Sequence, residues 1–222
     1  MLEVKELALF NYKPIRFILH PGNVVCVLGP NGCGKTTLLK LIMGEIDYVV
    51  GATFWKNKNI NQMNPKTKSL VFGHLSAENE EIYGFTPFEI VNFGRFSSPE
   101  LHSDEEILRS LEKFKCLHLK DKTYEQLSSG EKRRVLLARL DYQNSEIMIL
   151  DEPASYLDFK TKKIFSDWLI EKKKENKIII FTTHHWSDSF NECDYAIFFN
   201  SEEGNLNEIL FSTIVDIKPR LA

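Results

Sequence analysis

A glycine-rich segment near the N-terminus has the composition of a phosphate-binding loop. Residues 29–37 read GPNGCGKTT, which fits the pattern G-x-x-x-x-G-K-[ST], and they follow the apolar run Val24–Leu28, which predicts a buried strand. Glycines let backbone N–H groups converge on phosphate oxygens, Lys35 adds a charge for the β- and γ-phosphates, and the Thr36 hydroxyl can bind Mg²⁺. The predicted phosphate site comprises Gly29, Pro30, Asn31, Gly32, Cys33, Gly34, Lys35, Thr36 and Thr37.

Acidic residues end a second predicted strand. The apolar run Ile147–Leu150 is followed by Asp151 and Glu152. Two acids at a strand end are by themselves an ordinary solvated terminus. In a chain that also carries a phosphate loop, Asp151 can hold Mg²⁺ and Glu152 can polarise an attacking water molecule. A third predicted strand, residues 178–181, ends in Thr-Thr-His-His, where His184 is a candidate contact for a γ-phosphate.

A second candidate anion site is the sequence Leu-Ser-Ser-Gly-Glu at residues 127–131. Ser128 and Glu131 have the spacing of a capping box, so the start of a helix alone would account for them. The alternative is a phosphate site, because a serine hydroxyl, a flexible glycine and helix-terminal N–H groups together suit an anion.

Composition limits the classes of protein to which the chain can belong. Of its 222 residues, 43% are hydrophobic and 27% are charged, which is typical of a globular protein. The charges sum to 28 − 31 = −3, so bulk charge does not indicate nucleic-acid binding. The longest apolar runs span five residues, against about 18 or more for a membrane-spanning helix. We therefore expect no membrane span, no secretory signal and four reduced cysteines without metal.

Strand-like and helical segments alternate along the chain, which predicts an α/β layer fold. Turn residues and helices replace this alternation after residues 70–72, which indicates a helical insertion. Its strongest helix is expected to start at a capping box formed by Ser103 and Glu106. The predicted strands are residues 24–28, 147–150, 178–181 and 195–199, and the predicted helices are residues 36–43, 104–115, 131–140 and 158–174.

Together and in this order, these segments resemble the ATP-binding cassette (ABC) ATPase family over nearly the whole chain. Residues 29–37 resemble its Walker A loop, residues 127–131 its signature loop and residues 147–152 its Walker B strand. Ser-Tyr-Leu-Asp at residues 155–158 resembles the D-loop, which implies a place for Asp158 at the nucleotide, and His184 resembles the switch histidine.

The resemblance implies a P-loop NTPase fold of the α/β class, with a RecA-like core, a mainly parallel sheet, an N-terminal β subdomain and an inserted helical subdomain. We expect a single ABC ATPase domain over residues 1–222. Residues 1–72 and 131–222 are expected to form the core with its β subdomain. Residues 73–130 are expected to form the helical subdomain that carries the signature loop.

The resemblance also implies a mechanism, with ATP and Mg²⁺ as cofactors. ATP binds the Walker A loop of one subunit, where Lys35 contacts its phosphates and Thr36 and Asp151 hold Mg²⁺. In a head-to-tail dimer, the signature loop of the other subunit closes over this ATP. Glu152 is the implied base, and His184 holds the γ-phosphate. Hydrolysis reopens the homodimer or heterodimer and drives separate transmembrane permease subunits, which hold the ATPase at the cytoplasmic face of the membrane. The implied signature residues are Ser128, Ser129, Gly130 and Glu131.

The sequence departs from the family pattern at several positions. No glutamine stands at position 74 or 75, where the Q-loop glutamine belongs, and His74 is our candidate for its role; a missing or water-mediated contact is an equal alternative. Ser129 replaces the usual glycine and Glu131 a common glutamine. A side chain at Ser129 predicts slower hydrolysis or weaker dimerisation, because it loosens the approach of backbone to phosphate. For stacking on adenine, Tyr12 is the first candidate and Phe10 the second, with core packing as the alternative for Tyr12.

The branch of the family and the kind of function leave alternatives open. The sequences TPFE and FGRF at residues 86–89 and 93–96 are similar to ATPases that import metal chelates such as iron siderophores, haem or cobalamin. Gly73-His74 and Arg133-Arg134 are similar to the haem-exporter ATPase of cytochrome c maturation. Besides a transporter subunit, the alternatives are a soluble ABC ATPase acting on nucleic acid or ribosomes, and a nucleotide-gated module that hydrolyses poorly. We expect no nucleic-acid partner.

Overall fold

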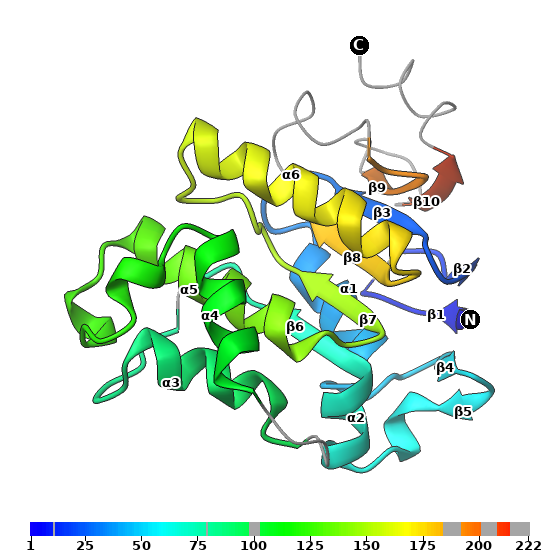
Figure 1. Ribbon diagram of the computed structural model, residues 1–222. Helices are drawn as coiled ribbons and strands as arrows, with labels where there is room; N and C mark the ends of the chain where they lie inside the picture. The colour runs from blue at the N-terminus through cyan, green and yellow to red at the C-terminus, as the bar shows by residue number, and fades with distance from the viewer. Residues whose placement is uncertain (11, 79, 98–102, 184–191, 201–207, 214–222) are drawn as a thin grey trace.

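The strands form two sheets that pack against each other (Figure 1). The computed structural model describes residues 1–10, 12–78, 80–97, 103–183, 192–200 and 208–213. One sheet is antiparallel and contains, in spatial order, β2 (Ile15–Leu19), β1 (Leu2–Leu7), β4 (Ala52–Trp55) and β5 (Lys58–Asn59). The other contains β10 (Glu208–Thr213), β9 (Tyr195–Asn200), β3 (Val24–Leu28), β8 (Ile178–Thr182), β7 (Ile147–Leu150) and β6 (Phe72–Leu75).

The six-stranded sheet is parallel except at one edge. β9, β3, β8, β7 and β6 run in the same direction, and β10 pairs antiparallel with β9. Every residue of β3, β7 and β8 is buried, because both faces of the sheet are covered, and this explains their unbroken apolar runs. All four predicted strands are confirmed, and β8 and β9 each extend one residue beyond the prediction.

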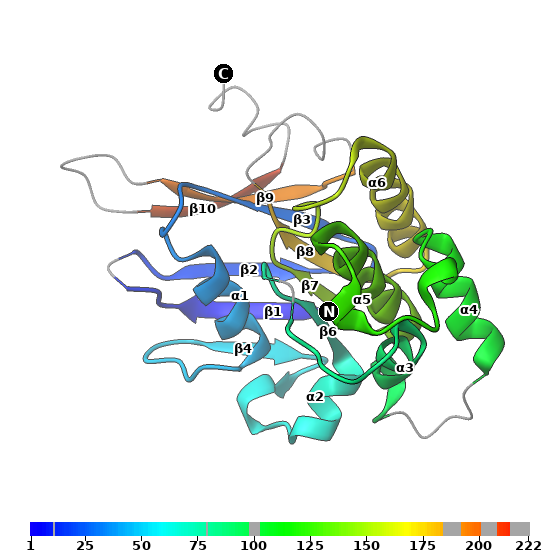
Figure 2. The same cartoon turned by 90° about the vertical axis from the view of Figure 1, so that its left-hand side faces the viewer.

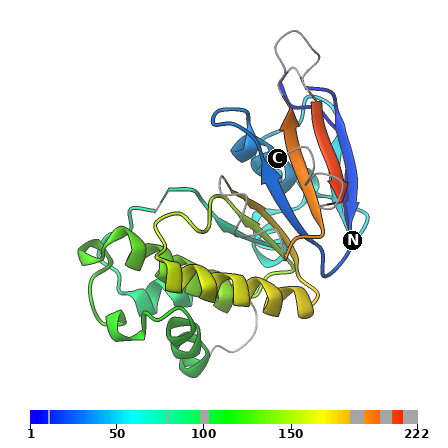
Figure 3. The same ribbon diagram turned by 90° about the horizontal axis from the view of Figure 1, so that it is seen from above.

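Helices cover the parallel sheet unequally. The helices of the described residues are α1 (Lys35–Met43), α2 (Pro65–Val71), α3 (Pro87–Asn92), α4 (Asp104–Lys113), α5 (Ser129–Gln143) and α6 (Phe159–Lys174), with 3₁₀ turns at Ile60–Gln62, Phe93–Arg95, Leu117–Leu119 and Tyr124–Gln126. α1 and the antiparallel sheet pack on one face, and α3 to α6 gather on the other (Figure 2). Seen from above, the green and yellow helices α4 to α6 lie on the opposite side of the molecule from α1 and β10 (Figure 3).

Two consecutive elements, α2 and the edge strand β6, are absent from the sequence-based expectation. Asn64 Oδ1 accepts a hydrogen bond of 2.8 Å from the Thr67 N–H, and Pro65 occupies the first turn of α2, so an Asn-Pro start signal was available. β6 follows directly and pairs with β7. Residues 73–75, which we expected in the helical subdomain, therefore belong to the parallel sheet.

The predicted helices are confirmed with shifted ends. α5 is longer than predicted at both ends, whereas α4 ends at Lys113, two residues before its predicted end. The capping box predicted at Ser103 is wrong. Ser103 Oγ accepts a hydrogen bond from the Glu105 N–H at 3.2 Å, and the Glu106 carboxylate instead forms an ion pair of 2.6 Å with Arg95, since that guanidinium lies beside it.

Two further expectations from the sequence concern membrane-spanning helices and the state of the cysteines. Within the described ranges, no helix combines the length and apolarity that crossing a bilayer requires. The four cysteines, all within the described residues, form no disulfide; Cys33 is partly exposed, and Cys26, Cys116 and Cys193 are buried.

A buried carboxylate joins three of the helices on one face of the sheet. Asp141 of α5 accepts hydrogen bonds from Trp168 Nε1 of α6 at 2.9 Å and from Ser110 Oγ of α4 at 3.0 Å. Its oxygens also lie 3.0 Å from Lys172 Nζ and 3.2 Å from Lys113 Nζ. Burial alone would raise the pKa of Asp141, but the two lysines and Trp168 hold it below its ordinary value. The ionised carboxylate therefore ties α4 and α6 to α5.

Asp141→Asn is expected to lower the free energy of unfolding by about 3 kcal/mol, because the amide removes the negative charge that faces two partly or fully buried lysines. Urea denaturation measures this change. Asp167→Asn, at an exposed position on α6, is the matched control and should shift the free energy by less than about 0.5 kcal/mol. Equal stability of the two variants would contradict the role of Asp141.

Candidate active site

The phosphate loop connects the end of β3 to the N-terminus of α1. Gly34 caps α1 with a φ of +109°, in the left-handed region that favours glycine, and a Cβ there would lie 3.1 Å from Phe10 Cε2. At Gly29, with a φ of +155°, a Cβ would lie 2.7 Å from Phe199 Cβ. The two glycines therefore let the loop pass close to its neighbours. The first N–H groups of α1 have no partner in a preceding turn and are available to an anion.

Lys35 lies inside the curve of this loop. The residue is 7% exposed, and Nζ donates hydrogen bonds of 2.9 Å to the carbonyl oxygens of Gly29 and Pro30. The ammonium is thus a fixed positive charge at the point where β- and γ-phosphate oxygens would meet it.

Polar side chains from three elements meet beside the loop. The buried Asp151 carboxylate, which follows β7, accepts hydrogen bonds from the hydroxyls of Thr36 in α1 and Thr182 in β8, the second at 2.5 Å. The two predicted metal-binding residues are therefore in contact and present oxygen ligands, the kind that Mg²⁺ takes. Thr182 is missing from the predicted site. Its signal was a threonine at the end of the apolar run 178–181.

The described part of the chain contains no cluster of three or more histidine, cysteine, aspartate or glutamate side chains that could hold a metal. A metal beside Asp151 would consequently take the Thr36 hydroxyl, one carboxylate and oxygens of a bound phosphate as ligands. This ligand set fits Mg²⁺, which binds proteins through one or two carboxylates together with substrate phosphates.

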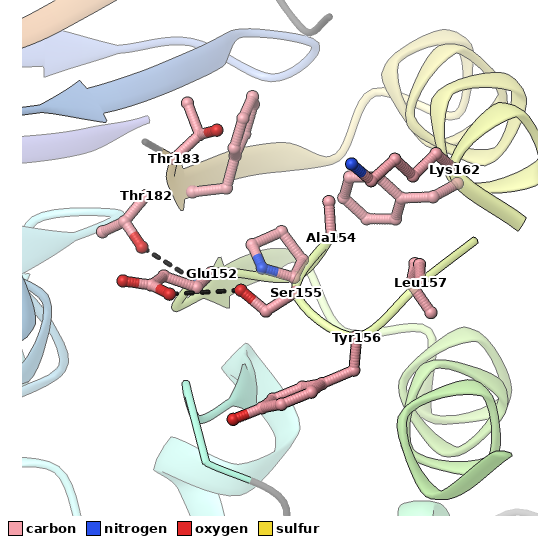
Figure 4. Close-up of a pocket in the computed structure, with 11 residues that line it drawn as sticks. Glu152, Ala154, Ser155, Tyr156, Leu157, Lys162, Thr182 and Thr183 are labelled. Carbon is pink, nitrogen blue, oxygen red and sulfur yellow. Dashed lines mark hydrogen bonds between the residues drawn. The ribbon is translucent and has the colours of Figure 1, made fainter. Parts of the chain in front are cut away.

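Glu152 follows Asp151 in a strained backbone conformation, with a φ of +47° in the left-handed region. Its N–H donates a hydrogen bond of 2.7 Å to Thr182 Oγ1, and its carboxylate accepts one of 3.1 Å from Ser155 Oγ (Figure 4). Such strain persists only where the surroundings hold the residue, and it is concentrated at active sites.

A pocket of about 240 Å³ brings the phosphate loop and the acids together. It unites the predicted catalytic and metal-binding residues of the loop and of β7 in one cavity. None of residues 128–131, which are also described, lines it. Its lining consists of Phe10, Asn31, Gly32, Gly34, Lys35, Thr36, Thr37, Asp151 and Glu152.

The aromatic residue that lines this pocket is Phe10 rather than Tyr12. Phe10 is 72% exposed. Tyr12 instead packs edge to face against Phe199 of β9, with ring centroids 5.3 Å apart and ring planes at 87°. Tyr12 therefore has the packing contact given as its alternative, and stacking of either ring on adenine stays a prediction.

The capping box predicted at the start of α5 is confirmed. Ser128 Oγ accepts a hydrogen bond of 3.4 Å from the Glu131 N–H, and Glu131 Oε2 accepts bonds from the Ser128 N–H and hydroxyl at 2.9 and 2.8 Å. These bonds from Ser128 lower the pKa of Glu131. Ser129 is exposed, and a Cβ at Gly130 would lie 2.9 Å from the carbonyl oxygen of Tyr156. Glycine at 130 thus permits close contact between α5 and residues 155–158.

Asp158, another predicted site residue, does not line the phosphate pocket. Asp158 caps α6, where Oδ1 accepts a hydrogen bond of 2.7 Å from the Thr161 N–H, and this bond lowers the pKa of Asp158. Tyr156 and Phe159 beside it are 58% and 86% exposed. His184 lies outside the described residues. Nucleotide contacts of Asp158 and His184 stay predictions.

His74 lines a second pocket, of about 600 Å³, which shares Thr36 and Asp151 with the phosphate pocket. Its Nδ1 lies 3.7 Å from Glu45 Oε1. Burial lowers the pKa of His74, and the negative charges of Glu45, Asp151 and Glu80 oppose this effect. Leu75, the other position for the Q-loop residue, is fully buried. The lining consists of Thr36, Lys40, His74, Ser76, Ala77, Glu78, Glu80, Glu81 and Asp151.

Comparison with known proteins gives the family. The sequence model of the family described as ABC transporter matches residues 12–155. A cytochrome c biogenesis ATP-binding export protein of Aliivibrio fischeri is 31% identical over 83% of this chain and 92% of its own length. The manganese transport system ATP-binding protein of Synechocystis is 30% identical over 88% of this chain and 76% of its own length. A putative ABC transporter ATP-binding protein of Clostridium tetani is 32% identical over 91% of this chain, which spans 47% of that relative.

Solved structures agree on the fold. CbiO1 of Clostridium perfringens, described as part of the ABC transporter complex CbiONQ, has a TM-score of 0.79 with 26% identity over 99% of this chain and 91% of its own. An ATP-binding subunit of an ABC transporter has a TM-score of 0.85 with 22% identity, and the match covers 99% of this chain and 92% of that one. Together with the family match, the mainly parallel sheet, the phosphate loop and the two acids are therefore those of a P-loop NTPase. The chain belongs to the ABC transporter ATP-binding proteins, and it is an ABC-type ATPase.

Proposed function

We propose that this chain binds Mg-ATP in the pocket of the phosphate loop, hydrolyses it as one half of a head-to-tail dimer and so powers transport through separate transmembrane subunits. The observation that carries the proposal is the convergence of Lys35, Asp151 and Glu152 on one pocket. The names of its relatives, which describe cytochrome c biogenesis export, manganese transport and spermidine/putrescine import, support the coupling to transport.

Each residue of the pocket has a role in this proposal. Loop N–H groups and the Lys35 ammonium bind phosphate oxygens. Thr36 and Asp151 hold Mg²⁺, which when bound neutralises charge on the β- and γ-phosphates. The Glu152 carboxylate, oriented by Ser155, accepts a proton from the attacking water molecule. Phe10 offers its exposed ring to adenine.

The second half of the site is proposed to come from another copy of the chain or from a second ABC subunit. Residues 128–131 stand at the N-terminus of α5, where the helix dipole favours an anion. They do not line the pocket of their own chain. Closure of one subunit over the nucleotide of the other would also cover Tyr156 and Phe159, the exposed aromatics beside Asp158.

His74 is proposed to take the place of the Q-loop glutamine, since it shares a pocket with Thr36 and Asp151. The proposed membrane partners are permease subunits, which would hold the ATPase peripherally at the cytoplasmic face, where ATP is available. Cargo and direction would then be properties of the permease, in keeping with relatives named for both import and export.

Glu152→Gln tests the proposed mechanism. The variant should bind Mg-ATP and accumulate as a closed dimer, because nucleotide binding survives while the water molecule is no longer activated. Light scattering after size exclusion, with and without Mg-ATP, measures the mass, and phosphate release measures turnover. Glu112→Gln, exposed on α4, is the matched control and should keep wild-type turnover. A monomer under both conditions would contradict the dimer, and wild-type turnover no higher than that of Glu152→Gln would favour the nucleotide-gated module.

Ser129→Gly should raise turnover by about twofold to tenfold, equivalent to roughly 0.4–1.4 kcal/mol of activation free energy, since it removes the Cβ from the backbone that approaches phosphate. Ser129→Ala separates the Cβ from the hydroxyl, because it keeps the former and removes the latter. Steady-state phosphate release from all three proteins is the measurement. A glycine variant that is no faster than wild type would refute the effect of the side chain.

A further inference from the structure

Arg133 is a fully buried cation one turn into α5, the helix that begins with the signature loop. Its Nη2 donates to the carbonyl oxygens of Asp151 at 2.8 Å and Glu152 at 2.6 Å. Its Nε donates to the carbonyl of Pro153 at 3.2 Å, and Nη1 to that of Ser76 at 2.5 Å. One guanidinium therefore holds three consecutive peptide groups of the turn that carries both acids.

Such an arrangement needs a planar donor. Arginine presents five N–H donors in a fixed fork, whereas lysine offers three donors at one point and an apolar side chain offers none. Burial lowers the pKa of Arg133 to about 10, so the side chain is still charged at neutral pH. In the described structure its hydrogen bonds all go to main-chain carbonyls, and no ion pair with a carboxylate is formed.

The peptide groups that Arg133 holds are those on which the position of Glu152 depends. Glu152 has a left-handed φ of +47°, which a glutamate adopts only when it is held from outside. Its N–H donates to Thr182 of β8, and its carbonyl oxygen accepts from Arg133 of α5 at 2.6 Å and from the Ser155 N–H at 3.1 Å. Removal of the guanidinium would leave that carbonyl with the Ser155 N–H and would also release the carbonyls of Asp151 and Pro153, so the turn could relax and carry the carboxylate with it.

The same helix also holds the segment after β6. Arg133 binds the carbonyl of Ser76, and Arg139, further along α5, forms a two-pronged ion pair with Glu80 through bonds of 2.9 Å. α5 thus connects three parts of the molecule: the signature loop at its start, the turn of Asp151 and Glu152, and Ser76 and Glu80, which line the same pocket as His74.

We infer that Arg133 is a positioning residue for Glu152, which fixes the left-handed turn of the proposed base and ties it to the helix of the signature loop. This inference rests on the proposed role of Glu152 in activating water. This connection gives α5 a second role. When the nucleotide of the partner subunit displaces the signature loop, Arg133 passes that movement to the Glu152 carboxylate of the same subunit.

Two substitutions test this inference, because each should lower kcat while the affinity for nucleotide stays nearly unchanged. Arg133→Met should lower kcat about 100-fold, the loss that a displacement of about 1 Å in a catalytic group can cause. Arg133→Lys, which keeps the charge but not the fork, should lower kcat about tenfold. Both should bind a fluorescent ATP analogue within about threefold of the wild-type Kd, and with Mg-ATP both should form the dimer that Glu152→Gln forms. Arg134→Met is the matched control, since among the described residues the neighbouring arginine donates to the surface carbonyl of Lys115 and not to the turn of Glu152, and it should keep wild-type kcat.

The possible outcomes separate a positioning role from a merely structural one. Wild-type kcat in Arg133→Met, or a loss of kcat matched by an equal loss of nucleotide affinity, would overturn the inference. If Arg133→Met does not fold, Arg133→Lys decides, and unchanged kcat in that variant overturns it. Wild-type turnover no higher than that of Glu152→Gln would instead overturn the proposed function, and the inference with it.

Discussion

The site depends on a single buried carboxylate that receives a hydroxyl from each side. Asp151 accepts hydrogen bonds from Thr36 and from Thr182, residues that stand at the start of α1 and at the end of β8. Because the carboxylate itself ends β7, these bonds connect the phosphate loop to two neighbouring strands. A buried charge that lacked such partners would be strongly destabilising. The same contacts place two oxygen ligands side by side where Mg²⁺ would meet the phosphates of ATP.

The position of this carboxylate follows from the parallel sheet. β3, β8 and β7 are adjacent and run in one direction, so their C-terminal ends meet at one edge. Their side chains are buried on both faces, between α1 with the antiparallel sheet and the helices α3 to α6. The strands therefore have little freedom to shift, and the polar residues that follow them are held in place. Through Arg133, α5 adds a restraint from the helical side.

The features that were predicted from sequence are those encoded within a few neighbouring residues. The phosphate loop, the two acids after β7 and the capping box of Ser128 and Glu131 each occupy one short segment whose spacing indicates its chemistry. α2 escaped prediction because its polar composition has no apolar periodicity, although Asn64 and Pro65 mark its start.

The features that were missed depend on contacts between distant segments. Thr182 joins the site because β8 lies beside β7, and strand order is not encoded in the local pattern. Phe10 rather than Tyr12 lines the pocket because Phe199, on β9, packs against Tyr12. Arg133 follows the signature loop as an ordinary residue of the helical pattern, and only the folded chain places it under the turn of Glu152.

The most direct test of the account is phosphate release from Mg-ATP by the purified wild-type chain and by Asp151→Asn. The account predicts measurable turnover by the wild type and a rate lower by roughly 100-fold or more in the variant, because the amide cannot supply the charged metal ligand on which stabilisation of the transferring phosphate relies. Equal rates in the two proteins would contradict it.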